Sequence, residues 1–102
     1  MRYQEESLLR ACYTNQVALA EKAIAMGANV NIKTDLFGCT TPLNLATFWG
    51  NIKMILFLLK NGANIDLKDM KGCTAKHIAS VNLINSKDNI VGILDKWGLE
   101  NV

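Results

Sequence analysis

A five-residue motif returns along this chain of 102 residues and constrains its fold more than any other feature. The motif reads GANVN at 27–31 and GANID at 62–66, and a weaker echo, GLEN, follows at 98–101. Successive copies start 35 and 36 residues apart. A second series runs alongside it, with GCTTPLNLA from Gly38 and GCTAKHIA from Gly72. A period in the mid-thirties predicts stacked supersecondary units.

Each unit is predicted to be a helix, a turn, an antiparallel helix and an extended loop. In the second unit, Thr41 can cap a short helix and Pro42 suits its first turn, so we expect this helix to end near 49–50. The second helix carries an apolar stripe and stops at a glycine, which suits a left-handed helix end. The predicted stripes are Val17, Ala20 and Ile24 before Gly27; Ile52, Ile55, Leu56 and Leu59 before Gly62; and Ile90, Ile93, Leu94 and Trp97 before Gly98. We expect Ile55, Leu56, Leu58 and Leu59 to be core residues.

Composition excludes several classes of protein. With 20% charged residues and a net charge of +2, the chain has no strong polyelectrolyte character. The longest apolar run, 54–59, is far short of the roughly 20 residues that cross a bilayer. The N-terminus has acidic residues where a secretory signal has an apolar stretch, so we expect a cytoplasmic protein. Cys12, Cys39 and Cys73 are odd in number and widely spaced, which predicts free thiols in a reducing compartment.

The combined motifs resemble those of the ankyrin-repeat family. The family pattern is Asp-x-x-Gly-x-Thr-Pro-Leu-His-x-Ala, followed after a Leu-rich helix by a Gly-Ala-Asp/Asn-x-Asn/Asp loop. The matching residues are Asp35, Gly38, Thr41, Pro42, Leu43 and Ala46 in the second unit, Asp69, Gly72, Thr74, His77 and Ala79 in the third, and Gly62, Ala63, Asn64 and Asp66 in a loop. The resemblance covers nearly the whole chain. It implies an all-α ankyrin-repeat solenoid of stacked helix-turn-helix units with hairpin-like loops. We expect one domain, 1–102, with repeats at about 4–33, 34–67 and 68–102.

The sequence also departs from the family pattern. Asn44 stands where the family usually has His, so the side-chain bond that steadies the loop is either remade or lost. Extra residues before Thr41 predict a longer or bulged second loop. In the third unit, Ala75 and Lys76 replace Pro-Leu and the connection between the two helices is longer. A charged residue in place of Leu is typical of a terminal repeat that faces solvent.

No constellation of residues predicts catalysis or a cofactor. His77 matches the structural His of the family motif, so the resemblance implies a hydrogen-bonding role in the scaffold. Asp35 and Asp69 recur once per unit at loop starts, which indicates turn capping. The sequence has no glycine-rich phosphate loop, no metal-ligand spacing and no nucleophile signature. We therefore expect no enzymatic activity, no cofactor and no metal site.

Large apolar residues beside turns are the candidates for a contact surface. In this family, the positions around the loop Asp and at the end of the first helix are variable and line the concave face and loop edge. Carried over, the resemblance implies these partner-binding residues: Tyr13, Leu36, Phe37, Phe48, Trp49, Met70, Lys71 and Val81. We expect Tyr13, Phe37, Phe48, Trp49 and Met70 to form one apolar ridge, because exposed aromatic patches usually mark interaction sites. The alternative is that some of them, Phe48 first, fold back into the thin stack.

The resemblance implies a protein–protein interaction module that binds a partner protein through its concave face and loops. A sharper version is a dedicated inhibitor or immunity-type protein that masks a target enzyme. A different class is nucleic-acid or membrane-surface binding through loop lysines, which neighbouring aspartates weaken. These lysines are Lys33, Lys68, Lys71 and Lys76. We expect no nucleic-acid or membrane partner, and a monomer rather than a homo-oligomer.

Overall fold

Six helices make up the regular structure that the computed structural model describes, which covers residues 2–33, 40–81 and 87–100 and gives the backbone alone at 81, 87–89 and 98–100. The helices are α1 (Tyr3–Thr14), α2 (Val17–Ala25), α3 (Pro42–Trp49), α4 (Ile52–Lys60), α5 (Ala75–Val81) and α6 (Lys87–Glu100). These described ranges contain no strand. The predicted all-α fold is confirmed.

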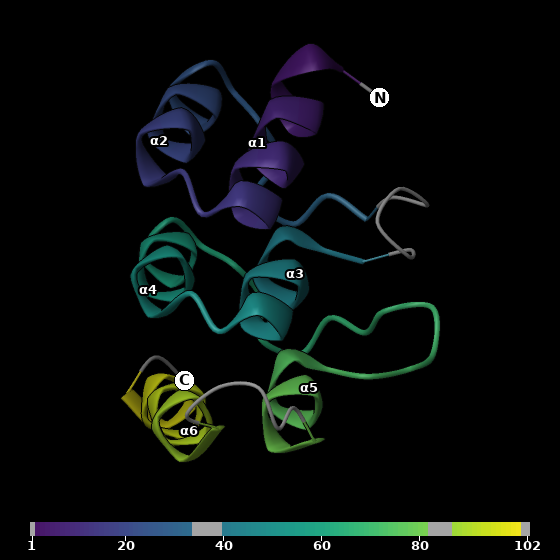
Figure 1. The fold of residues 1–102 in the computed structure, drawn as a ribbon, viewed down its shortest axis with the longest axis vertical. Coiled ribbons are helices and arrows are strands. Elements are labelled where there is room, and N and C mark those ends of the chain that lie inside the picture. Colours follow the sequence, from purple (N-terminus) through teal and green to yellow (C-terminus); the bar gives the residue numbers. More distant parts are fainter. Residues whose placement is uncertain (1, 34–39, 82–86, 101–102) are drawn as a thin grey trace.

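The helices form two layers, with α1, α3 and α5 in one and α2, α4 and α6 in the other (Figure 1). Each unit pairs one helix from each layer, and the units stack through contacts of α1 with α3 and of α3 with α5. The loop at 61–74 extends from the α5 side of the stack, away from the second layer (Figure 1). The layer of α1, α3 and α5 therefore has two sides. We call the side where the loops lie the loop edge; the tight turns between paired helices lie on the other side.

Local signals at both ends of α3 act as the sequence predicts. The Thr41 hydroxyl accepts a hydrogen bond from the backbone N–H of Asn44 at 3.2 Å, and Pro42 is the first helical residue. Gly50 ends the helix with φ 71°, in the left-handed region that favours glycine. In the first unit the equivalent terminal residue is Asn15, with φ 57°. Both units therefore turn sharply just after the last residues of their first helix.

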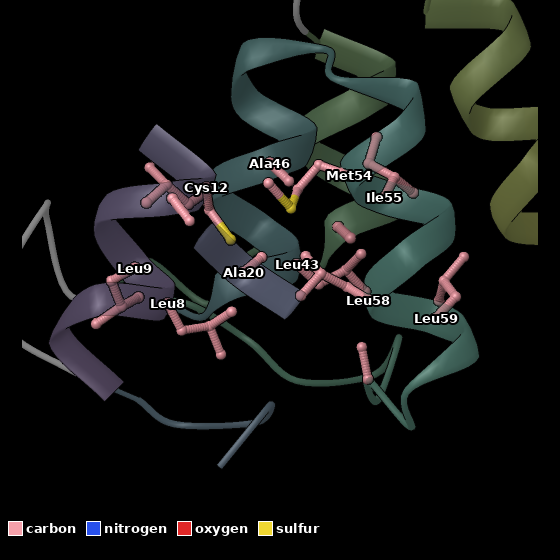
Figure 2. Packing of buried hydrophobic residues seen from close by; sticks show 14 of the residues in the cluster. Leu8, Leu9, Cys12, Ala20, Leu43, Ala46, Met54, Ile55, Leu58 and Leu59 are labelled. Carbon is pink, nitrogen blue, oxygen red and sulfur yellow. The ribbon is translucent and has the colours of Figure 1, made fainter. Parts of the chain in front are cut away.

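The core runs through both layers, with buried side chains from α1, α2, α3 and α4 meeting in one cluster (Figure 2). The predicted stripe positions Ala20, Ile55, Leu59, Ile90 and Leu94 are buried. The prediction was wrong for two residues of α4. Leu56 is only half-buried and Ile52 is 36% exposed, while Met54 and Leu58 are fully buried. Because α4 is apolar on nearly all sides, periodicity alone did not fix which stripe faces the core.

The predicted helix end at Gly98 was also wrong, since α6 continues through Glu100. A comparison with the other two copies of the motif gives the reason. In each of those loops an asparagine Oδ1 accepts a hydrogen bond from the backbone N–H two residues further along the chain. Asn29 bonds Asn31 at 3.0 Å, and Asn64 bonds Asp66 at 2.8 Å. In the echo GLEN, Glu100 replaces this asparagine. Glutamate is a better helix former and does not favour this turn.

Candidate functional site

Three aromatic side chains gather where the first helices of two repeats end. Tyr13 lies in the last turn of α1, and Phe48 and Trp49 are the last residues of α3. The rings of Tyr13 and Trp49 have centroids 5.3 Å apart and planes at 78°, and those of Phe48 and Trp49 are 5.2 Å apart at 90°. We call Tyr13, Phe48 and Trp49 the aromatic cluster, and the side of the stack where the helix–helix turns lie the turn edge.

The aromatic cluster is ordered and still partly open to solvent. Tyr13, Phe48 and Trp49 are 48%, 47% and 39% exposed. Edge-to-face ring pairs have preferred geometry and add about 0.5–1.5 kcal/mol beyond the area they bury. The ring contacts thus stabilise the arrangement of the three side chains, while a large part of their apolar surface stays exposed to solvent. Phe48, the residue with a predicted alternative place inside the stack, keeps nearly half of its surface outside it.

Met70 and Lys71 lie on the opposite edge of the first layer. The Asn44 side chain, in the first turn of α3, donates from Nδ2 to the carbonyls of Leu67 and Cys73, both at 3.4 Å. The two residues that flank the segment with Met70 and Lys71 therefore lie beside the N-terminus of α3. The aromatic cluster includes the C-terminus of α3, about 12 Å away for a helix of this length. Both loop residues are exposed, Met70 to 66%.

The remaining candidates stay predictions. Leu36 and Phe37 lie outside the described residues, and Val81 ends α5 with its backbone alone described. Of the predicted ridge, the structure joins Tyr13 with Trp49 and Phe48 with Trp49 through ring contacts.

A second set of residues fastens one repeat to the next at the loop edge, and sequence reasoning missed Asn31 among them. Asn31 donates from Nδ2 to the Gly62 carbonyl at 3.1 Å, and its Oδ1 accepts from the Asn64 backbone N–H at 2.8 Å. Asn44 adds its two bonds to the loop at 61–74, so the bond that usually comes from His is remade. The signal for Asn31 was present in the sequence, because a polar residue recurs at this motif position as Asp66.

Two titratable side chains near the loops, Asp69 and His77, were predicted to have structural roles. Oδ1 of Asp69 accepts from the backbone N–H groups of Lys71 and Cys73, each at 2.9 Å, which confirms the predicted turn cap. His77 differs from its predicted scaffold role. Its side chain is exposed and makes no hydrogen bond with another described residue.

Two observations concern reactive groups among the described residues. Burial raises the pKa of the Cys12 thiol to about 12, so this sulfur stays protonated and unreactive at neutral pH. In the described ranges no three His, Cys, Asp or Glu side chains come together as a metal site. Likewise, none of the described helices is both long enough and apolar enough to span a membrane.

Of the four lysines considered for a basic stripe, one lies in a helix and is paired with an aspartate. Lys33, Lys68, Lys71 and Lys76 are all exposed. Lys76, however, is paired with Asp95 across the α5–α6 interface, with Nζ 2.7 Å from Oδ1. Asp66 and Asp69 alternate with Lys68 and Lys71 along the loop and place negative charge beside them.

Comparison with known proteins agrees with the geometry of the fold. A family profile described as ankyrin repeats, in three copies, matches residues 8–100. The chain is 36% identical over 74 residues, 72% of its length, to the human "Arf-GAP with coiled-coil, ANK repeat and PH domain-containing protein 2". It is 30% identical over 97 residues, 93% of its length, to the "Transient receptor potential cation channel subfamily A member 1 homolog" of Caenorhabditis elegans. The matched parts are 10% and 8% of those proteins.

Proposed function

Because this chain belongs to the ankyrin-repeat family, whose members are generally protein-interaction modules, we propose that it binds a partner protein through the aromatic cluster at the turn edge. The observation that carries the proposal is the contact between Tyr13 and Trp49, which unites two repeats in one exposed apolar surface. Aromatic anchors of this kind dominate binding hot spots. A rigid repeat stack also loses little conformational entropy on docking.

The proposed contact surface is smaller than the set of partner-binding residues predicted from the sequence. Tyr13, Phe48 and Trp49 are the anchors of the contact. Met70 and Lys71, at the loop edge, belong to a separate surface and serve as the matched comparison. We propose no catalytic step for the chain, and we expect it to act as a monomer in the cytoplasm.

Affinity capture with mass spectrometry tests the proposal. The wild-type chain is compared with Tyr13→Ala/Trp49→Ala and with Met70→Ala/Lys71→Ala, after circular dichroism has shown that all three are folded. We expect the first variant to lose a protein that the wild type and the second variant retain. If only Met70→Ala/Lys71→Ala loses the protein, the proposed contact through the aromatic cluster is wrong and the partner binds at the loop edge. If all three capture the same proteins, neither surface is the binding site.

The captured protein also separates the narrower alternatives. An enzyme whose activity falls on addition of the wild-type chain supports the masking role, whereas an enzyme with unchanged activity supports recruitment or scaffolding. Binding that weakens steeply with salt would instead support the lysines Lys33, Lys68, Lys71 and Lys76 as the contact, because charge-dominated binding follows ion release. We expect binding through the aromatic cluster to tolerate salt.

A further inference from the structure

The sequence contains a single Asn-Gly pair, Asn61–Gly62, at the point where α4 ends and the loop at 61–74 begins. Asparagine is one of the chemically labile residues that heat-adapted proteins avoid. Glycine has no Cβ, so its backbone nitrogen approaches the preceding side chain with the least steric hindrance. An asparagine before a glycine is therefore suited to cyclisation, in which the glycine nitrogen attacks the asparagine Cγ. Both residues are exposed, so water can reach the product.

The end of α4 keeps the two reacting groups occupied and apart. Nδ2 of Asn61 donates to the Phe57 carbonyl at 2.8 Å, so the side chain is directed back along the helix. The Gly62 N–H donates to the Leu59 carbonyl at 3.1 Å. Gly62 has φ 91°, in the left-handed region that closes a helix. Cyclisation therefore requires that both of these hydrogen bonds break and that the Asn61 side chain turns toward the Gly62 nitrogen.

A side chain from the preceding repeat adds a further restraint on the same segment. Nδ2 of Asn31 donates to the Gly62 carbonyl at 3.1 Å, and its Oδ1 accepts from the Asn64 N–H at 2.8 Å. Exposed loops open locally at a lower cost in free energy than the whole domain. We therefore expect the bonds of Asn31 to set how often the Asn61–Gly62 pair is free to react.

The first loop has the same backbone geometry without the reactive amide. Gly27 also has φ 91°, and its N–H donates to the Ile24 carbonyl at 2.9 Å. The residue before it is Met26, whose thioether has no group for the glycine nitrogen to attack. Methionine thus fits this position of the loop, so Asn61→Met is a chemically inert control.

We propose that Asn61–Gly62 is a self-modification site whose reaction is held back by the folded stack. The Gly62 nitrogen forms a bond to Cγ of Asn61, and the bond from Cγ to Nδ2 breaks. Nδ2 leaves as ammonia and takes the proton of the Gly62 N–H, so a cyclic imide remains. Water then opens the ring at either of its two carbonyl carbons and gives aspartate or isoaspartate. The reaction consumes only water, and no group is oxidised or reduced.

The products weaken the attachment of the loop to the preceding repeat. In isoaspartate the main chain runs through Cβ and Cγ of the modified residue, so it is longer by one carbon atom and shifts the Gly62 carbonyl relative to Asn31. In both products a carboxylate replaces the amide that donates to the Phe57 carbonyl. This negative charge lies at the C-terminus of α4, where the helix dipole disfavours it.

Peptide mapping by mass spectrometry of the full chain, incubated at neutral pH, tests the proposal. The readout is the rate at which Asn61 is converted to the acid in folded wild type, Asn31→Ala and Asn15→Ala, and in wild type unfolded in guanidinium chloride. A reaction that passes through an open state follows the population of that state. We expect folded wild type to react at least about tenfold more slowly than the unfolded chain. We expect Asn31→Ala to react about fivefold faster than folded wild type, because two exposed hydrogen bonds are lost.

Asn15→Ala separates opening of the loop from unfolding of the whole stack, because Asn15 lies at the turn edge, away from this loop. The free energies of unfolding of both variants are measured alongside, so that the rates are compared at equal loss of stability. We expect Asn15→Ala to react close to the wild-type rate. Equal acceleration at equal loss of stability would overturn the proposal, and so would a folded wild type that reacts as fast as the unfolded chain.

Asn31→Asp decides the case in which Asn31→Ala does not fold. It keeps an acceptor for the Asn64 N–H and loses only the donor to the Gly62 carbonyl, so we expect a smaller acceleration. A rate equal to that of wild type in a folded Asn31→Asp would overturn the role of this bond. Converted wild type, separated by ion exchange, is expected to exchange its Asn64 amide faster than Asn61→Met after the same incubation; equal exchange would overturn the loosening of the loop.

Discussion

At the loop edge of the stack, polar side chains cross from one repeat to the next, whereas at the turn edge aromatic rings meet across repeats and stay partly exposed. Asn31 and Asn44 end on backbone groups of the following loop, so their bonds fix how the repeats are placed. The aromatic cluster keeps between 39% and 48% of its surface open, so it has apolar area left to bury. The difference separates the polar bonds between repeats from the surface that we propose for partner binding, so we expect variants at the two edges to affect stability and binding separately.

The largest expected loss of stability at the loop edge comes from Asn44→Ala. Asn44 is 1% exposed, and its removal leaves the Leu67 and Cys73 carbonyls without this donor. Unmade buried hydrogen bonds cost about 1–3 kcal/mol, so we expect the free energy of unfolding to fall by about 2 kcal/mol. Urea denaturation measures the change. Asn44→His, which restores the usual family residue, is the control and is expected to lose less; equal losses would show that the donor to the loop is not what matters.

The next largest loss is expected for Asn31→Ala, at the interface of the first two repeats. This change removes two solvent-exposed hydrogen bonds, so we expect a fall of about 1 kcal/mol in the free energy of unfolding. Asn61→Ala is the matched control, since Asn61 donates to the Phe57 carbonyl within its own repeat at 2.8 Å. Equal losses for the two variants would contradict the claim that asparagines bridging repeats are special.

A pH series tests the contribution of Glu5 to stability. Its Oε2 accepts a hydrogen bond from the Asn29 backbone N–H at 2.8 Å. The pKa of Glu5 is lowered from its ordinary value of 4.5, chiefly by the hydrogen bond from Arg2. A lowered folded-state pKa means that the contribution of Glu5 is present above pH 4.5 and lost as pH falls through the folded-state pKa. We expect the urea midpoint to fall more between pH 7 and about pH 3 in wild type than in Glu5→Gln. Equal falls in both proteins would contradict this assignment.

The smallest expected effect lies at the turn edge, where Asn15 has a left-handed backbone and its equivalent is Gly50. Asn15→Gly removes a side chain that this conformation disfavours. We therefore expect the free energy of unfolding, measured by thermal unfolding, to rise by about 0.5 kcal/mol. Asn15→Ala is expected to change stability in the opposite direction, since alanine tolerates the left-handed region less well than asparagine. A gain for both variants would show that the backbone conformation of Asn15 is not what limits this turn.

Local signals in the sequence predicted most of the fold. The cap at Thr41, the first-turn Pro42 and the terminal Gly50 fixed the bounds of α3, because each acts within a few residues of its own position. Predictions failed where tertiary context decides. Leu56 lies on a helix that is apolar on nearly all sides, and Gly98 lies in a motif copy whose asparagine has become a glutamate.

The candidate site was predictable by residue type and less so by arrangement. Aromatic residues beside turns identified Tyr13, Phe48 and Trp49, but only the packing of α1 against α3 brings the ring of Tyr13 into contact with that of Trp49. The bonds that Asn31 makes to the loop at 61–74, and the bond that Oε2 of Glu5 accepts from the Asn29 backbone N–H, join residues 24 to 33 positions apart, and sequence gives the polar side chain without its partner. One signal for Glu5 was available, because it lies three residues before Leu8 on the apolar stripe of α1.

The most direct test of the central claim is the dissociation constant of Trp49→Ala for the protein that the wild-type chain captures, measured by isothermal titration calorimetry. Loss of a hot-spot aromatic costs about 2 kcal/mol or more, so the account predicts a dissociation constant raised by about 30-fold or more. The folded fraction of the variant is established first by urea denaturation. A folded variant whose dissociation constant equals that of the wild type would contradict the account, and would leave Trp49 a role in holding two repeats together.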